Sequence, residues 1–150
     1  MAEPLYLDDL GVGQCFQAGP MSVAASDIVA YAQKFDPQPF HLDAEAAKDT
    51  FFGGLAASGW HTASLTMRLL VQALPFAWGV IGGGGEITWP RATRPGDGLR
   101  VECEIIEIVP SRSRPDRGMV TMRTTTLNQR DEPVQVLVAK LVVPRRGAGP

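Results

Sequence analysis

The chain has 150 residues, of which 45% are hydrophobic and 20% are charged, and its formal net charge is −2 at neutral pH. This length indicates a single domain over residues 1–150, and the composition excludes intrinsic disorder and a coiled coil. No apolar run reaches the ~18 residues that a membrane span needs. The N-terminal residues lack the basic-then-apolar pattern of a secretory signal, and two cysteines are too few for a disulfide framework. We therefore expect a cytoplasmic protein in a reducing environment.

The first part of the chain is expected to hold two helices. Ser26 is a candidate N-cap, and an apolar stripe follows it up to Phe35, where Asp36-Pro37 must end the helix. A second, short helix is predicted from residue 43 to residue 49, with Asp43 as its N-cap. The segment from residue 51 to residue 54 is expected to be a loop.

The strongest helical pattern runs from about Gly59 to Leu74 and ends at Pro75. Apolar residues cover most of its circumference, so we expect this helix to be buried. Its polar residues share one stripe, because they follow the i, i+3, i+7, i+11 spacing of a helix face: His61, Ser64, Arg68 and Gln72. Because no histidine or carboxylate follows His61 at i+4, we predict it to be a hydrogen-bonded core residue rather than a metal ligand.

After Pro75 the apolar pattern changes to the period of two that is typical of strands. Four segments are predicted as strands: residues 86–89, 99–105, 120–126 and 134–143. The alternation slips at Ile105-Ile106, which predicts a bulge, and the last segment is apolar on both faces, as in a central strand. Gly82–Gly85 is interpreted as a flexible turn, because the Gly-Lys-Ser/Thr of a phosphate-binding loop does not follow it. An antiparallel sheet folded around one buried helix, an α+β fold, is the expected architecture.

Charge is unevenly distributed along the chain. Residues 1–90 carry a net charge of −6 and residues 91–150 a net charge of +4. The overall negative charge argues against nucleic acid as a main partner. The arginines of the second part either lie on solvated strand faces or form a patch for phosphate groups, which suit the planar guanidinium. The candidates for such a patch are Arg91, Arg94, Arg112, Arg114 and Arg117.

The segment from Phe35 to Asp43 contains the residues best suited to chemistry. Two prolines within three residues stiffen it, and a stiff loop would hold Asp36 and His41 at a set separation. A carboxylate and an imidazole held in this way can move a proton to one atom and from another. The structural alternative is that Asp36 caps a turn and that His41 bonds to the backbone.

Three motifs in this chain, in the same order, resemble those of the MaoC-like dehydratases, the (R)-specific enoyl-CoA hydratases of hot-dog fold. The first motif is Asp36-Pro-Gln-Pro-Phe-His41, and the second is Ala57-Ser-Gly-Trp-His-Thr-Ala-Ser64 at the start of the long helix. The third is Trp89-Pro-Arg-Ala-Thr-Arg-Pro-Gly-Asp97, which follows a strand. Together the three motifs are far more specific than the pair of Asp36 and His41 alone.

The resemblance implies reversible syn addition of water to a trans-2-enoyl-CoA, giving a (3R)-hydroxyacyl-CoA, with no metal and no redox cofactor. It assigns Asp36 and His41 as the catalytic pair that activates the water. Gly59 would stabilise the charge on the thioester oxygen through its backbone N–H at the helix N-terminus, and Ser64 would lie near the catalytic groups. The expected partners are an acyl-CoA and a second copy of the chain, without nucleic acid or membrane. The homodimer would have a continuous sheet and active sites at its interface.

The chain departs from the family pattern at several positions. Phe35 stands where glycine is usual, Gln38 where asparagine is usual, and Ser58-Gly59-Trp60 replaces His-Gly-(Met/Leu). None of these changes removes a proton-transfer group. Trp60, next to the expected oxyanion donor, either reshapes the acyl pocket or fills the core.

Two other functions are compatible with a hot-dog fold. An acyl-CoA thioesterase needs only one general base to activate water, so the spaced pair of Asp36 and His41 favours hydration over hydrolysis. A non-catalytic acyl-CoA-binding subunit would need neither residue, and both are present.

Overall fold

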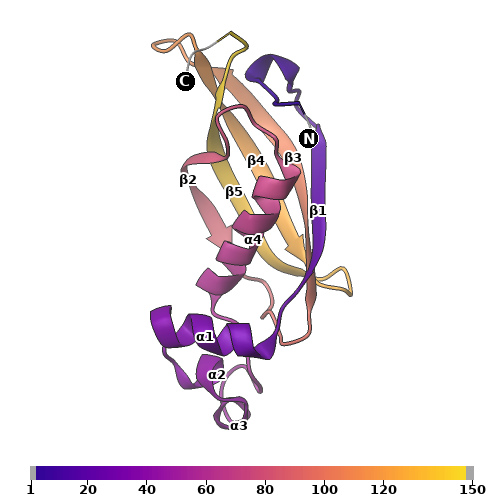
Figure 1. The fold of residues 1–150 in the computed structure, drawn as a ribbon, viewed down its shortest axis with the longest axis vertical. Coiled ribbons are helices and arrows are strands. Elements are labelled where there is room, and N and C mark those ends of the chain that lie inside the picture. Colours follow the sequence, from indigo (N-terminus) through magenta and orange to yellow (C-terminus); the bar gives the residue numbers. More distant parts are fainter. Residues whose placement is uncertain (1–2, 148–150) are drawn as a thin grey trace.

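The computed structural model describes residues 3–147 (Figure 1). After a short 3-10 helix at Leu7–Asp9, the elements in chain order are β1 (Cys15–Ser22), α1 (Ala25–Phe35), α2 (Pro39–Leu42), α3 (Ala44–Ala47), α4 (Gly59–Ala73), β2 (Ile81–Thr88), β3 (Gly98–Pro110), β4 (Arg117–Leu127) and β5 (Pro133–Pro144). Among the described residues, none of the helices has both the length and the apolar character that crossing a bilayer requires.

The strands form one antiparallel sheet in the order β1-β3-β4-β5-β2. Apolar residues are buried at every second position of β3 and β4. Ile105 of β3 lies opposite Met122 of β4, and side chains of directly opposite residues share a face, so these buried residues of both strands point to the same face of the sheet. Helix α4 lies along this face, and its Leu69 and Leu70 complete the core (Figure 1). The predicted α+β architecture, a sheet wrapped around one helix, is confirmed.

Helices α1, α2 and α3 gather at one end of the molecule, next to the start of α4 (Figure 1). The loop between β3 and β4 lies at the opposite end, together with both termini. The predicted bulge is confirmed, since the register of β3 shifts between Ile105 and Glu107, and β5 is an interior strand as expected. Asp43 caps α3 as predicted, because its side chain accepts hydrogen bonds from the backbone N–H groups of Glu45 and Ala46.

Two strands differ from the prediction. Glycine and proline in β1, and four glycines in β2, interrupt the apolar alternation by which a strand is predicted. Strand β1 was not predicted, since it contains Gly19-Pro20; as an edge strand it tolerates the proline at a shift in register. The interpretation of Gly82–Gly85 as a turn is wrong, because these residues belong to β2 and pair with β5. A Cβ atom on Gly85 would lie 2.5 Å from the Val138 carbonyl oxygen, so this glycine permits the close approach of the two strands.

Two expectations about the helices also need correction. Helix α1 has Ala24 rather than Ser26 at its N-cap, with no side-chain cap. Helix α4 is buried on one face only, because Trp60, Met67 and Val71 remain 60%, 45% and 60% exposed. The apolar residues on its outer face are therefore largely uncovered within the described chain.

Candidate active site

The local sequence brings Asp36 and His41 together where α1 ends. Asp36 is the C-cap of α1, and the helix stops there because Pro37 disfavours the helical conformation in the residue before it. Pro39 then begins α2, a short helix where a stiff loop was expected, and this single turn carries His41 back towards Asp36. The distance from His41 Nε2 to Asp36 Oδ2 is 3.3 Å.

The second ring nitrogen of His41 is held by the backbone. Nδ1 lies 2.6 Å from the carbonyl oxygen of Ala56, and the side chain is buried. A carbonyl oxygen can only accept, so Nδ1 donates, and Nε2 is the atom left to exchange a proton. His41 therefore meets both expectations: it bonds to the backbone, and it faces a carboxylate.

The carboxylate of Asp36 is kept ionised by its neighbours. Burial alone would raise its pKa, but the hydrogen bond from Gln38, the nearby Ser58 hydroxyl and the charge of His41 together lower the pKa below its usual value. Gln38 Nε2 donates to Asp36 Oδ1 at 2.5 Å. Ser58 Oγ is fully buried and makes no hydrogen bond of normal geometry. It lowers the pKa of Asp36 as a nearby hydroxyl dipole and not through a formed hydrogen bond.

A cavity of about 250 Å³ opens in front of His41. Three large aromatic side chains line it, from Phe51, Phe52 and Trp89. The indole N–H of Trp89 donates to the buried Gln135 Oε1 at 2.9 Å, which fixes the ring. Of the pair, His41 lines the cavity and Asp36 does not. A mainly apolar cavity with an imidazole in its wall suits a substrate that has an apolar chain and one reactive polar group.

Gly59 lines the same cavity as His41, as the sequence predicted for the oxyanion donor. It is the first residue of α4, and within the described chain its backbone N–H donates to no other group. A Cβ atom at this position would lie 2.8 Å from the Trp89 ring. The absence of a side chain thus lets the indole pack directly on the start of the helix.

Trp60 and Ser64 lie on the exposed face of α4. Ser64 Oγ donates to the Trp60 carbonyl oxygen at 2.9 Å and does not line the cavity of His41 in this chain. The expectation that Trp60 fills the core is wrong, because its side chain is exposed. It packs edge-on against Trp89 with 5.4 Å between ring centroids, so it supports one wall of the cavity from outside.

His61 is a core residue, but it is not hydrogen-bonded as predicted. Its ring stacks on Tyr31 with 4.7 Å between centroids, and its buried Nδ1 has no partner in the described chain. Burial lowers the pKa of His61, against a smaller opposing effect of the Asp27 charge. Across the described residues, no group of three or more His, Cys, Asp or Glu side chains is arranged to hold a metal ion.

The predicted arginine patch is divided between the two ends of the molecule. Arg112, Arg114 and Arg117 belong to the loop between β3 and β4 and the start of β4, at the end opposite to α2 (Figure 1). Arg91 and Arg94 lie near the catalytic pair. Arg91 lines both the cavity of His41 and a neighbouring polar pocket of about 360 Å³.

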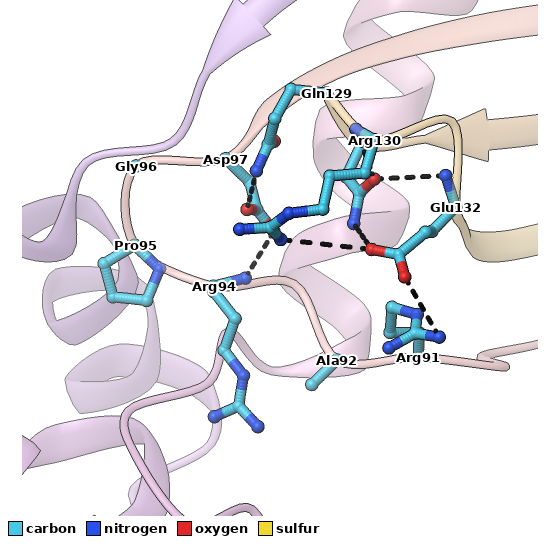
Figure 2. A pocket seen from close by; sticks show the side chains of 10 residues that line it. Arg91, Ala92, Arg94, Pro95, Gly96, Asp97, Gln129, Arg130 and Glu132 are labelled. Carbon is cyan, nitrogen blue, oxygen red and sulfur yellow. Dashed lines mark hydrogen bonds and ion pairs between the residues drawn. The ribbon is translucent and has the colours of Figure 1, made fainter.

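Figure 2 shows this polar pocket, in which Glu132 lies between two arginines. Arg91 Nη2 is 3.2 Å from Glu132 Oε2, and Arg130 Nη1 is 3.9 Å from Glu132 Oε1. The Arg94 side chain points away from this group. Arg130, which sequence reasoning did not single out, belongs to the pocket through the turn between β4 and β5.

Sequence reasoning also missed the neighbours that tune and enclose the pair. Gln38 was noted only as a departure from the family pattern, and its position two residues after Asp36 was the available signal. Phe52 and Trp89 reach the cavity from distant segments. No local pattern marks Phe52, and Trp89 belongs to the third motif but was not assigned to the site.

A five-stranded antiparallel sheet around one helix defines a hot-dog protein, and its candidate site is the paired aspartate and histidine. The family model for the MaoC-like domain matches residues 11–128, and the chain belongs to the MaoC-like dehydratase family.

Three relatives illustrate the match. The crystal structure of a MaoC-like dehydratase from Rhodospirillum rubrum is 58% identical, with a TM-score of 0.94, covering 96% of this chain and 99% of that one. The R-hydratase PhaJ1 from Pseudomonas aeruginosa is 29% identical with a TM-score of 0.78, covering 95% and 88%. A 3-hydroxybutyryl-CoA dehydratase from Methylorubrum extorquens is 32% identical over 111 residues, 73% of this chain and 69% of the relative. These names place the chain among dehydratases and hydratases, which are lyases.

Proposed function

We propose that the protein catalyses the reversible hydration of a trans-2-enoyl-CoA to a (3R)-hydroxyacyl-CoA. The observation that carries the proposal is the contact of 3.3 Å between Asp36 Oδ2 and His41 Nε2, together with the position of His41 in the wall of a cavity that Phe51, Phe52 and Trp89 also line. The names of the relatives from Methylorubrum extorquens and Pseudomonas aeruginosa agree with this reaction.

The mechanism divides the proton transfers between the two side chains. A water molecule held between Asp36 and His41 attacks C3, and Asp36 takes its proton as the C3–O bond forms. The π electrons move towards the thioester oxygen, where the free N–H of Gly59 stabilises the enolate. His41, which enters the reaction with a proton on each ring nitrogen, then gives its Nε2 proton to C2 from the same side, which gives syn addition. Transfer of the proton from Asp36 to His41 restores the starting state, so protons balance.

Recognition of the CoA phosphates is proposed for the polar pocket of Figure 2. Arg91 connects this pocket to the cavity of His41, and Arg130 adds a second guanidinium. Both guanidinium groups share Glu132, so each keeps donors free for a phosphate. The cytoplasmic location stays a prediction.

A homodimer is proposed because two unpartnered features adjoin each other. Strand β2 is an edge of the sheet, and the exposed face of α4 borders it through the contact of Trp60 with Trp89, the residue after β2. The family resemblance implies the same assembly.

The pair of Asp36 and His41 is tested by single and double substitution. Asp36→Asn cannot take a proton and His41→Ala removes its partner, so each should lower kcat by on the order of 10²-fold or more. The double variant should be little worse than the poorer single one, because the two residues act on one water. Loss of enoyl thioester absorbance and release of free CoA are followed in parallel.

Asp49→Asn is the matched control, since Asp49 is an exposed carboxylate just after α3. It should hydrate at the wild-type rate. A His41→Ala variant as active as the wild type would refute the assignment. Release of CoA that depends on Asp36 alone would identify a thioesterase, and no turnover of any enoyl-CoA would favour a binding subunit.

A further inference from the structure

Arg94 is committed to the backbone of a segment next to the catalytic histidine. Its Nη1 donates to the carbonyl oxygens of Gly54 at 3.0 Å and Leu55 at 3.3 Å, and its Nη2 donates to that of Phe52. These residues lie between α3 and α4, where no helix or strand satisfies their carbonyl groups. One guanidinium therefore replaces the missing backbone partners of three residues.

The same segment carries the group that orients His41. The carbonyl oxygen of Ala56 accepts from His41 Nδ1 at 2.6 Å. The peptide group before Ala56 is held on both sides, by Arg94 at the Leu55 carbonyl and by the bond of 3.0 Å from Ala56 N to the Phe40 carbonyl. The peptide group after Ala56 is held by the bond of 2.9 Å from Ala57 N to the Thr93 carbonyl. Arg94 is thus the side chain among the three groups that fix the peptide planes on either side of the Ala56 carbonyl.

We propose that Arg94 is a positioning residue that aims His41 at Asp36 through the Ala56 carbonyl. The inference rests on the proposed hydration only for its effect on rate, since the state of His41 can be measured without substrate. Arg94 is itself held in place, because its backbone N–H donates to Asp97 Oδ2 at 2.8 Å.

A role in binding CoA phosphates predicts a different result for Arg94. Loss of an exposed phosphate contact raises KM, and the effect shrinks as salt screens the charge. Loss of a positioning residue lowers kcat, because a small displacement of a catalytic group is costly, and salt has little influence on it. The three carbonyl contacts and the orientation in Figure 2 favour positioning.

The first test is ¹⁵N NMR of the imidazole rings in Arg94→Ala without substrate. The chain contains two histidines, so one variant of His61 assigns both sets of signals. In the wild type we expect the signal of a protonated Nδ1 in His41. In Arg94→Ala this signal should broaden or move towards a mixture of tautomers, while that of His61 stays in place. A His41 signal identical to the wild type would overturn the proposal.

The second test is the kinetics of the same variant with trans-2-butenoyl-CoA. We expect kcat to fall by on the order of 10-fold to 10²-fold, with a much smaller change in KM at any salt concentration. Millimolar guanidinium chloride should restore part of the rate by filling the vacated site. A rise in KM at unchanged kcat would assign Arg94 to phosphate binding instead.

Two further variants separate positioning from stability. Arg123→Ala, which removes an exposed ion pair with Glu104 on the sheet, should leave both the spectrum and kcat unchanged. Arg94→Lys serves if Arg94→Ala does not fold, since one ammonium cannot span three carbonyl groups, and it should show the same change in His41. A variant that loses only thermal stability, with the His41 signal intact, would refute the proposal.

Discussion

Asp36 depends on its immediate neighbours for its charge. Burial acts to raise its pKa, and the hydrogen bond from Gln38 is the foremost of the contacts that outweigh burial. The lowered pKa keeps the carboxylate available as a base down to a more acid pH than an ordinary aspartate would allow. Gln38, a departure from the family pattern, thus supports the protonation state that the proposed hydration needs.

Replacing Gln38 should therefore change the pH dependence of the reaction. Gln38→Ala removes the donor to Asp36 Oδ1, so the pKa of Asp36 rises and the acid limb of kcat/KM moves to higher pH. The profile is measured with trans-2-butenoyl-CoA. Gln17→Ala, an exposed glutamine on β1, is the control and should keep the wild-type profile. An acid limb at the same pH in both variants would show that Gln38 does not lower the pKa of Asp36.

At the level of elements, the start of α4 and the end of β2 meet without a side chain between them. A methyl group on Gly59 would lie within 3 Å of the Trp89 ring, which Gln135 holds from the other side. Because this ring lines the cavity of His41, a shift of the ring would change the shape of that cavity. This contact explains why a glycine is needed at a helical position where its backbone conformation is ordinary.

Gly59→Ala should therefore lower activity and stability together. Overpacking of this kind costs about 1–3 kcal/mol, and the displaced indole should lower kcat for trans-2-butenoyl-CoA. Trp89→Leu in the same chain should recover stability, which thermal unfolding measures. Gly11→Ala, where a Cβ atom meets nothing within 4 Å, is the control. Full activity of Gly59→Ala would show that the indole is free to move.

The elements differ in how far the sequence predicts them. Helix α4 and strands β3, β4 and β5 carry long apolar patterns, and all four were predicted. Strand β1 contains Gly19-Pro20, which hides its pattern, so it was not predicted. The four glycines of β2 hide its first half, and only its second half was predicted, as the strand at residues 86–89. The burial of α4 was overestimated, because periodicity cannot tell a face that packs on the sheet from one left for a partner.

The residues of the candidate site also differ in how far the sequence predicts them. Asp36, His41 and Gly59 were predicted because they belong to one motif or to the start of one helix. The contacts that orient them come from elsewhere in the chain: the Ala56 carbonyl holds His41, and Arg94 reaches across to the residues before it. Such contacts depend on which segments the fold brings together, and a single sequence does not record them.

On the scale of the whole molecule, the arginines behind the uneven charge lie in two separate places. Of the predicted arginines, Arg91 adjoins the catalytic cavity, whereas Arg112 and Arg114 lie at the far end of the sheet. Arg91→Glu with Arg130→Glu should raise KM for trans-2-butenoyl-CoA on the order of tenfold at low salt and less at high salt, with kcat little changed. Arg112→Glu with Arg114→Glu is the matched control. An equal effect of both pairs would move the phosphate site to the far end.

The proposed homodimer is inferred from two surfaces that a single chain leaves uncovered. Along α4 the exposed apolar residues Trp60, Met67 and Val71 share one face, and β2 beside them has only β5 as a partner. Its glycines place no side chain in the way of a second strand, and unprotected edges of this kind are normally paired. A second copy related by a two-fold axis would cover both features at once, because each would meet its own counterpart.

Light scattering should therefore give twice the chain mass of 16.1 kDa at micromolar concentration. Val71→Asp places a charge in the middle of the apolar face of α4 and should shift the protein to monomer, because an unpaired charge is costly to bury. Hydration should fall with it, since Trp89, a wall of the catalytic cavity, lies at the same edge. Val109→Asp makes the same change at an exposed site near the far end of β3 and should remain dimeric. A wild-type mass near that of one chain would contradict the dimer, and an active monomeric Val71→Asp would separate catalysis from assembly.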